Sequence, residues 1–196
     1  MFDLIEFCFS TEKLNQMKKV AILIYGALAY ILFLIAFLYA IGFVGNMFVP
    51  KTINSGNEPS LITAIITNTL LLSVFALQHS IMARPKFKAW FNSIFSQAME
   101  RSTYILLSSL ALLLIFWKWQ PITTIVWEVE NTILFSILTG VFFLGWVIVL
   151  LSTFMINHFE LFGLSQIFNN LKNRKTPNPK FQTNYFYKLV RHPIML

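Results

Sequence analysis

Long apolar segments alternate along the chain with short polar segments that carry most of the charges. Four of the apolar segments approach the roughly 20 residues that an α-helix needs to cross a hydrocarbon core about 30 Å thick. They lie at about residues 20–44, 61–83, 102–119 and 132–158. Stretches such as Leu106–Trp117 lack the polar/apolar alternation of a membrane β-barrel. The pattern predicts an all-α fold: one membrane domain, a polytopic bundle with four transmembrane helices, followed by a cytosolic tail over residues 159–196.

The composition agrees with a lipid environment. Of the 196 residues, 57% are hydrophobic and only 12% are charged, whereas a soluble domain carries about 25% charged residues. The one cysteine, Cys8, excludes a disulfide within the chain. Because Cys8 lies in the apolar run Ile5–Phe9, we interpret it as a packed or interfacial thiol, with reversible lipidation as the alternative.

The positions of the basic residues predict the orientation in the membrane. Except for Lys51 and Lys118, every Lys and Arg lies before the first predicted helix, between the second and third, or after the fourth. Cytoplasmic loops carry such an excess of Lys and Arg, so both termini are predicted to be cytoplasmic. The net charge of +7 does not indicate nucleic-acid binding, because the basic residues flank apolar segments and do not form one basic domain.

A short amphipathic helix is predicted between the second and third membrane helices. Apolar side chains recur there at helical spacing, at Phe87, Trp90, Phe91, Ile94 and Phe95. The flanking residues Lys86 and Lys88 favour a helix that lies in the headgroup plane. It is either a connector beneath the bundle or one wall of a binding site.

Polar side chains inside a bilayer are costly, so they are candidates for function. Gln78 and His79 lie in the cytoplasmic half of the second helix, His158 and Glu160 end the fourth, and Arg191 and His192 lie in the tail. The predicted topology therefore brings all three histidines to the cytoplasmic side. The alternatives are interfacial hydrogen bonding for His79, a helix-dipole contact for His158 and phosphate headgroup binding for Arg191.

A metal or haem site finds little support in the pattern. His79 and His158 lie at similar predicted depth, so ligation of haem by both is conceivable. No spacing matches a zinc signature, and one cysteine cannot build a thiolate site. No glycine-rich phosphate loop is present either. We therefore predict no metal, and expect any cofactor to be held by the membrane helices and their cytoplasmic ends.

Three blocks of sequence carry a family resemblance. The first is Ala76–Pro85 (ALQHSIMARP) with Glu100–Tyr104 (ERSTY), and it resembles the nurim-type family. The blocks Ser152–Gln166 (STFMINHFELFGLSQ) and Lys188–Leu196 (KLVRHPIML) are similar to its methanethiol S-methyltransferase branch in particular. The Arg-His-Pro motif also resembles the broader superfamily of isoprenylcysteine carboxyl methyltransferases.

The resemblance implies a cofactor and the residues that bind it. Arg191 and His192 would border S-adenosylmethionine, with Gln78 as a further polar group. In the superfamily this motif continues through a glycine, a further membrane helix and a pair of glutamates. Since the chain stops at Leu196, a fifth helix is expected but missing, and we expect part of the cofactor site to lie beyond it.

The implied activity is S-adenosylmethionine-dependent methylation of a small thiol, methanethiol to dimethyl sulfide, at the cytoplasmic face of a bacterial inner membrane. A thiolate is the nucleophile in such a reaction, so a base is needed. His79 or His158 is the predicted base, with Glu160 in support. The alternatives are a methyltransferase with another acceptor, a haem carrier, and a non-enzymatic membrane factor of the nurim or denitrification-associated type.

Overall fold

The computed structural model describes residues 2–125 and 127–175, and side chains from Thr11 onward. This part of the chain is helical and contains no strand. Its elements are α1 (Phe2–Val44), α2 (Leu61–Met82), α3 (Pro85–Ile94), the 3-10 helix η1 (Gln97–Met99), α4 (Glu100–Lys118), α5 (Thr132–Ile156), α6 (His158–Leu161) and α7 (Leu164–Leu171). Four helical segments are long and apolar enough to cross a membrane: Thr11–Val44, Leu61–Met82, Gln97–Lys118 and Thr132–Ile156. The predicted all-α membrane bundle is therefore confirmed.

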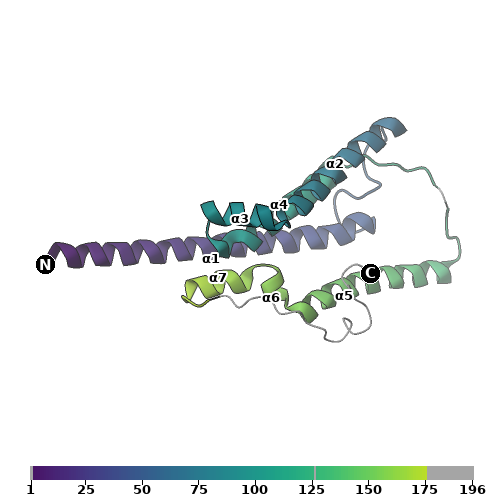
Figure 1. Cartoon of the computed structure of the whole chain (residues 1–196). Coiled ribbons are helices and arrows are strands. Elements are labelled where there is room, and N and C mark those ends of the chain that lie inside the picture. The colour runs from purple at the N-terminus through teal and green to yellow at the C-terminus, as the bar shows by residue number, and fades with distance from the viewer. Residues whose placement is uncertain (1, 126, 176–196) are drawn as a thin grey trace.

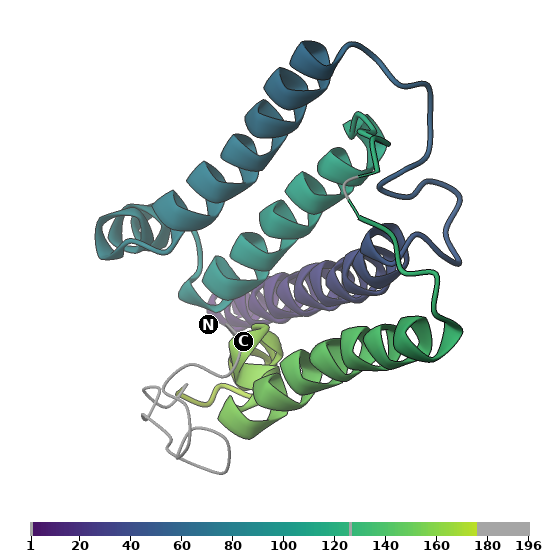
Figure 2. The ribbon, with the colours of Figure 1, turned by 90° about the vertical axis from the view of Figure 1, so that its right-hand side faces the viewer.

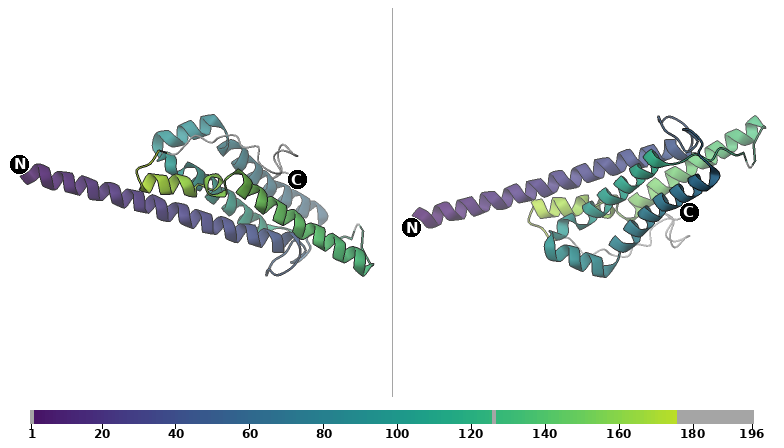
Figure 3. Two further views of the ribbon diagram at one scale, coloured as in Figure 1. Left: turned by 90° about the horizontal axis from the view of Figure 1, so that it is seen from below. Right: turned by 90° about the horizontal axis from the view of Figure 1, so that it is seen from above.

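The helices form a splayed bundle around α1 and α4 (Figures 1 and 2). α4 packs against both α1 and α2. α5 lies on another side of α1 and contacts it through Phe37 and Trp146, whose rings are 5.4 Å apart. At 1.5 Å per residue α1 is about 64 Å long, twice the hydrocarbon thickness. Its N-terminal part accordingly extends beyond the other helices (Figure 3).

Local sequence explains where the helices begin and end. α2 ends at Met82, and Pro85 occupies the first turn of α3, where the missing N–H of proline removes no hydrogen bond. Arg84 is extended between them, as expected of a residue before proline. α5 begins at Asn131, whose side-chain oxygen accepts hydrogen bonds from the N–H groups of Ile133 and Leu134.

After α5 the chain turns back against the bundle. Asn157 ends α5 with a positive φ of 127°, and Gly163 has a φ of 86° between α6 and α7. α7 packs on α1 and η1. The hydropathy pattern did not predict α6 and α7, which occupy the start of the segment interpreted as a tail.

Small residues allow the close approach of α1, α4 and the turn before α7. A Cβ atom on Gly163 would lie 2.9 Å from Ser102 Oγ, and one on Gly26 would lie 2.6 Å from a methyl group of Ile167. Ser102 and Ile167 are fully buried. Such small-residue contacts let membrane helices pack closely without a hydrophobic driving force.

Candidate functional site

A cavity opens at the end of the bundle where α2 ends and α4 begins. Its volume is about 220 Å³. α2, α3, α4 and α6 all contribute to its wall, which consists of Met82, Ala83, Phe87, Lys88, Phe91, Glu100, Arg101, Tyr104 and Leu161. Charged groups of both signs therefore lie beside aromatic rings and a thioether. This is also the end of the bundle to which α5 returns (Figure 1).

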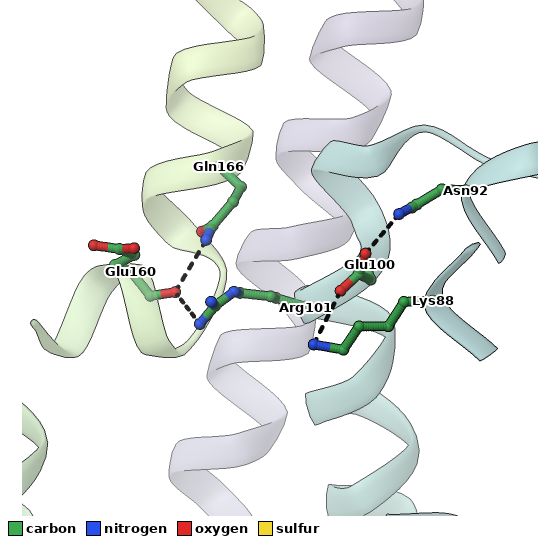
Figure 4. A network of polar contacts seen from close by, with 6 residues as sticks. All are labelled: Lys88, Asn92, Glu100, Arg101, Glu160 and Gln166. Atoms are coloured by element: carbon green, nitrogen blue, oxygen red, sulfur yellow. Dashed lines mark hydrogen bonds and ion pairs between the residues drawn. The ribbon is translucent and has the colours of Figure 1, made fainter. Parts of the chain in front are cut away.

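Hydrogen bonds and one ion pair hold the charged residues of the cavity in place (Figure 4). The carboxylate of Glu100 pairs with Lys88 Nζ at 3.5 Å and accepts a hydrogen bond from Asn92 Nδ2 at 2.7 Å. Arg101 donates to the carbonyl oxygen of Glu160 at 3.2 Å, and Gln166 donates to the same oxygen at 3.2 Å. These contacts connect α4 to α3 on one side and to the segment after α5 on the other.

His79 lies near the end of α2 and contacts Tyr104, which lines the cavity. Its ring stacks on Phe75 with 5.4 Å between centroids. The Tyr104 hydroxyl lies 2.8 Å from both ring nitrogens of His79. His79 is exposed at the protein surface, and Tyr104 links it to the cavity.

His158 occupies a separate, closed environment. It is 3% exposed and lies among the rings of Tyr30, Phe154 and Phe162. Tyr30 Oη is 2.7 Å from its Nε2, and Thr153 Oγ1 is 2.8 Å from its Nδ1. Burial lowers the pKa of His158, which favours the neutral imidazole.

The hydrogen-bond pattern fixes the tautomer of this neutral imidazole. Thr153 donates its single hydroxyl proton to the carbonyl of Leu150, at 2.6 Å. The same oxygen must therefore accept from His158, so Nδ1 carries the proton. Nε2 is then an acceptor for Tyr30. Both nitrogens of His158 are occupied by protein partners, and the residue connects α1 to the end of α5.

Glu160 and Gln78, the two other described candidates, have local partners. The Glu160 carboxylate accepts from Asn157 Nδ2 at 3.1 Å, while the Asn157 side chain accepts from the Glu160 N–H at 3.2 Å, a reciprocal cap of α6. Gln78 accepts from Ser108 on α4 at 3.2 Å and contacts the sulfur of Met82 at 3.1 Å. Glu160 reaches the site through its carbonyl rather than its carboxylate.

Two predicted site residues, Arg191 and His192, lie outside the described residues. The sequence does not single out Lys88, Glu100 and Arg101 as site residues, because Lys and Arg at helix ends also indicate membrane orientation. The amphipathic segment was the best available signal, since Phe87 and Phe91 on that face line the cavity. Within the described ranges no group of three or more His, Cys, Asp or Glu residues could hold a metal ion.

Comparison with known proteins identifies the family. The chain is 51% identical over 182 residues to methanethiol S-methyltransferase 1 of Bradyrhizobium diazoefficiens, covering 93% of this chain and 64% of that protein. It is 48% identical over 178 residues to methanethiol S-methyltransferase of Crocosphaera subtropica, covering 91% of this chain and 70% of that protein. A more distant relative is nurim of Danio rerio, 29% identical over 139 residues, covering 67% of this chain and 50% of nurim.

No protein-family profile matches the sequence, and no solved structure matches the chain. The relatives nevertheless confirm the resemblance seen in the three sequence blocks, and the four apolar helices make the protein an integral membrane protein. The chain belongs to the methanethiol S-methyltransferase family.

Proposed function

We propose that the protein transfers a methyl group from S-adenosylmethionine to methanethiol and releases dimethyl sulfide. The observation that carries this proposal is the identity of about half of all residues, over nine-tenths of the chain, to relatives that bear the name of this activity. The cavity at the end of α2 and the start of α4 is the proposed site.

The residues of the cavity fit such a methyl donor. One end of S-adenosylmethionine carries a carboxylate, an ammonium group and the sulfonium. Lys88 and Arg101 suit the carboxylate, and Glu100 suits the ammonium group. The faces of Phe87 and Phe91 suit a sulfonium cation. A volume of about 220 Å³ accommodates this end of the molecule. Arg191, His192 and Gln78 remain proposed contributors to the donor site through the family resemblance.

The bound donor supplies an electrophilic methyl group, and the protein has to supply a thiolate aligned with it. A thiol is a poor nucleophile until it loses its proton. His79 is the proposed base because it contacts the cavity residue Tyr104 and is exposed. His158 is less suited, since protein groups occupy both of its nitrogens. Alignment of the reactants in a site shielded from water supplies a further share of the rate.

The proposed location follows from charge and substrate. The basic residues around α3 and in the N-terminal half of α1 support a position of the cavity at the cytoplasmic face, with both termini cytoplasmic. A small apolar thiol partitions into the bilayer, whereas S-adenosylmethionine is charged and stays in the cytosol. A site at the membrane edge is accessible to the thiol from the bilayer and to S-adenosylmethionine from the cytosol. Because the relatives are bacterial enzymes, we propose the bacterial inner membrane.

Donor binding by the whole protein in lipid nanodiscs tests the proposal. Isothermal titration calorimetry with S-adenosylmethionine should give saturable binding that Glu100→Gln weakens by at least tenfold. Lys86→Ala is the matched control: Lys86 is exposed on α3 and does not line the cavity. Absence of binding by the wild-type protein would reject the methyltransferase and favour a non-enzymatic membrane factor of the nurim type.

A panel of acceptors then separates methanethiol from other substrates. Methanethiol, longer alkane thiols and thiol-free lipids are offered at equal concentration, and the methylated products are quantified by mass spectrometry. The proposal expects dimethyl sulfide as the main product. A faster reaction with a lipid or a larger thiol would retain the methyl transfer but replace the acceptor.

A further inference from the structure

Tyr104 is the cavity residue that reaches His79. It lies four residues after Glu100 on α4, so both side chains project from the same face of that helix toward the cavity. Its ring centroid is 5.0 Å from that of His79, and its hydroxyl is within 2.8 Å of the imidazole. Phe75 covers another side of the imidazole. Tyr104 therefore lines the cavity and also contacts the exposed histidine through its hydroxyl.

A phenolic hydroxyl can accept one proton while it donates another. Tyr104 can thus accept from a group in the cavity and donate to a ring nitrogen of His79 at the same time. The charged residues that line the cavity together with Tyr104 are Lys88 from α3 and Glu100 and Arg101 from α4. On the α1 side, α4 is met at this level by the uncharged Tyr25, which bonds to Thr103 at 2.9 Å.

We propose that Tyr104 relays the proton of the substrate thiol to His79. The inference rests on the proposed methyl transfer. The thiol proton passes to the Tyr104 oxygen as the Tyr104 hydroxyl proton passes to His79. The sulfur, left with its electron pair, forms a bond to the donor's methyl carbon while the bond from that carbon to the sulfonium breaks. The products are the thioether, the neutral demethylated donor and an imidazolium, which returns its proton to the aqueous interface beyond the end of α2, three residues after His79.

A second tyrosine–histidine pair in the bundle indicates what the relay requires. Tyr30 and His158 are also within hydrogen-bond distance, at 2.7 Å. There the second ring nitrogen is held by Thr153, and the histidine is 3% exposed, so it has no route to release a proton. His79 has an exposed ring and a tyrosine that faces a cavity. Among the described residues, Tyr104–His79 is therefore the one tyrosine–histidine pair in which the tyrosine lines a cavity and the histidine is exposed.

The variant Tyr104→Phe tests the relay, with Tyr25→Phe as its matched control. Both changes remove one phenolic hydroxyl: that of Tyr104 lies on α4, and that of Tyr25 contacts α4 through Thr103. Tyr25 does not line the cavity. At pH 7 we expect Tyr104→Phe to slow methyl transfer by about 100-fold, the lower range for general base catalysis. The deficit should narrow as the pH rises, because more of the thiol ionises in water. A merely structural role would lower the rate equally at every pH.

A second measurement does not depend on turnover. In protein labelled with ¹⁵N-histidine, which has three histidines, the resonances of His79 are assigned with His79→Gln. Tyr104→Phe should shift the His79 resonances and Tyr25→Phe should not, while calorimetric donor binding by Tyr25→Phe stays within twofold of wild type.

The outcomes separate the relay from the proposed function. A wild-type protein without methyl transfer would overturn the proposed function and the relay with it. Methyl transfer by wild type together with an unchanged rate and pH profile in Tyr104→Phe would overturn the relay alone. Unchanged His79 resonances in Tyr104→Phe would likewise overturn it.

Discussion

The hydroxyl of Tyr30 on α1 donates a hydrogen bond to Nε2 of His158, 2.7 Å away and 128 residues later in the chain. This bond ties the first membrane helix to the segment that follows the fourth. The two histidines near this end of the bundle have different environments, since His158 is enclosed and His79 is exposed.

Tyr30→Phe should destabilise the protein and leave the chemistry intact. The substitution leaves the buried Nε2 of His158 without its donor, and an unsatisfied buried polar atom costs about 1–3 kcal/mol. Thermal unfolding in detergent, followed by circular dichroism, should show a lower Tm. Leu38→Ala is the control, because this side chain is 65% exposed and lies on the outer surface of α1. A Tyr30→Phe protein as stable as wild type would argue against this hydrogen bond.

Stability should fall on mild acidification because of His158. Burial lowers its pKa in the folded state below the usual value of about 6.5. The unfolded state then binds more protons, so this contribution to stability is complete above about pH 6.5 and declines as the pH falls toward the folded pKa. A Tm series from pH 8 to pH 5 should be flatter for His158→Gln than for wild type. Parallel curves would contradict the burial of a neutral imidazole.

Gly163→Ala should be strongly unfavourable. Gly163 has a φ of 86°, and an added Cβ would lie 2.9 Å from Ser102 Oγ and 3.0 Å from Ser102 N. The left-handed conformation alone costs a non-glycine residue about 1–3 kcal/mol. Gly140→Ala is the control, because nothing lies within 4 Å of its added Cβ. We expect a clear drop in Tm for Gly163→Ala only; equal Tm values would mean that α6 and α7 do not approach α4 this closely.

Asn68→Leu should weaken the attachment of α2 to the segment that follows α4, at the end of the bundle away from the cavity. Asn68 is 5% exposed, donates to the Gln120 carbonyl at 2.8 Å and accepts from the Gln120 N–H at 2.9 Å. The leucine would leave both backbone groups without these partners, at about 1–3 kcal/mol for each one that stays buried. Hydrogen exchange at Gln120 should accelerate, and it should not do so in Thr69→Val, an exposed neighbour on α2. Unchanged exchange would contradict the role of this asparagine.

Local sequence was enough to predict the membrane helices, but not the contacts that shape the site. Continuous apolar runs identify α2 and α5, and Pro85 marks the start of α3. α6 and α7 escaped prediction because they are short, and their stability comes from packing on α1. The partner of His158 could not be found either, since no local pattern links Tyr30 to it.

The candidate site was predicted in outline only. Topology predicted that polar groups would gather at one end of the bundle, and His79 there contacts Tyr104, which lines a cavity. Glu100 and Arg101 begin α4, where charges also serve to orient the chain in the membrane, and their convergence with Lys88 depends on the angle between α3 and α4. That angle is a tertiary property, which hydropathy does not encode.

Transfer of a labelled methyl group tests the central claim most directly. The whole protein in nanodiscs is incubated with methanethiol and S-adenosylmethionine whose transferable methyl group is trideuterated, and the headspace gas is analysed by mass spectrometry. The account predicts dimethyl sulfide with a single CD₃ group, formed in proportion to protein and reduced by about 100-fold in His79→Gln. Dimethyl sulfide without the label, or no dimethyl sulfide from a protein that binds the donor, would contradict it.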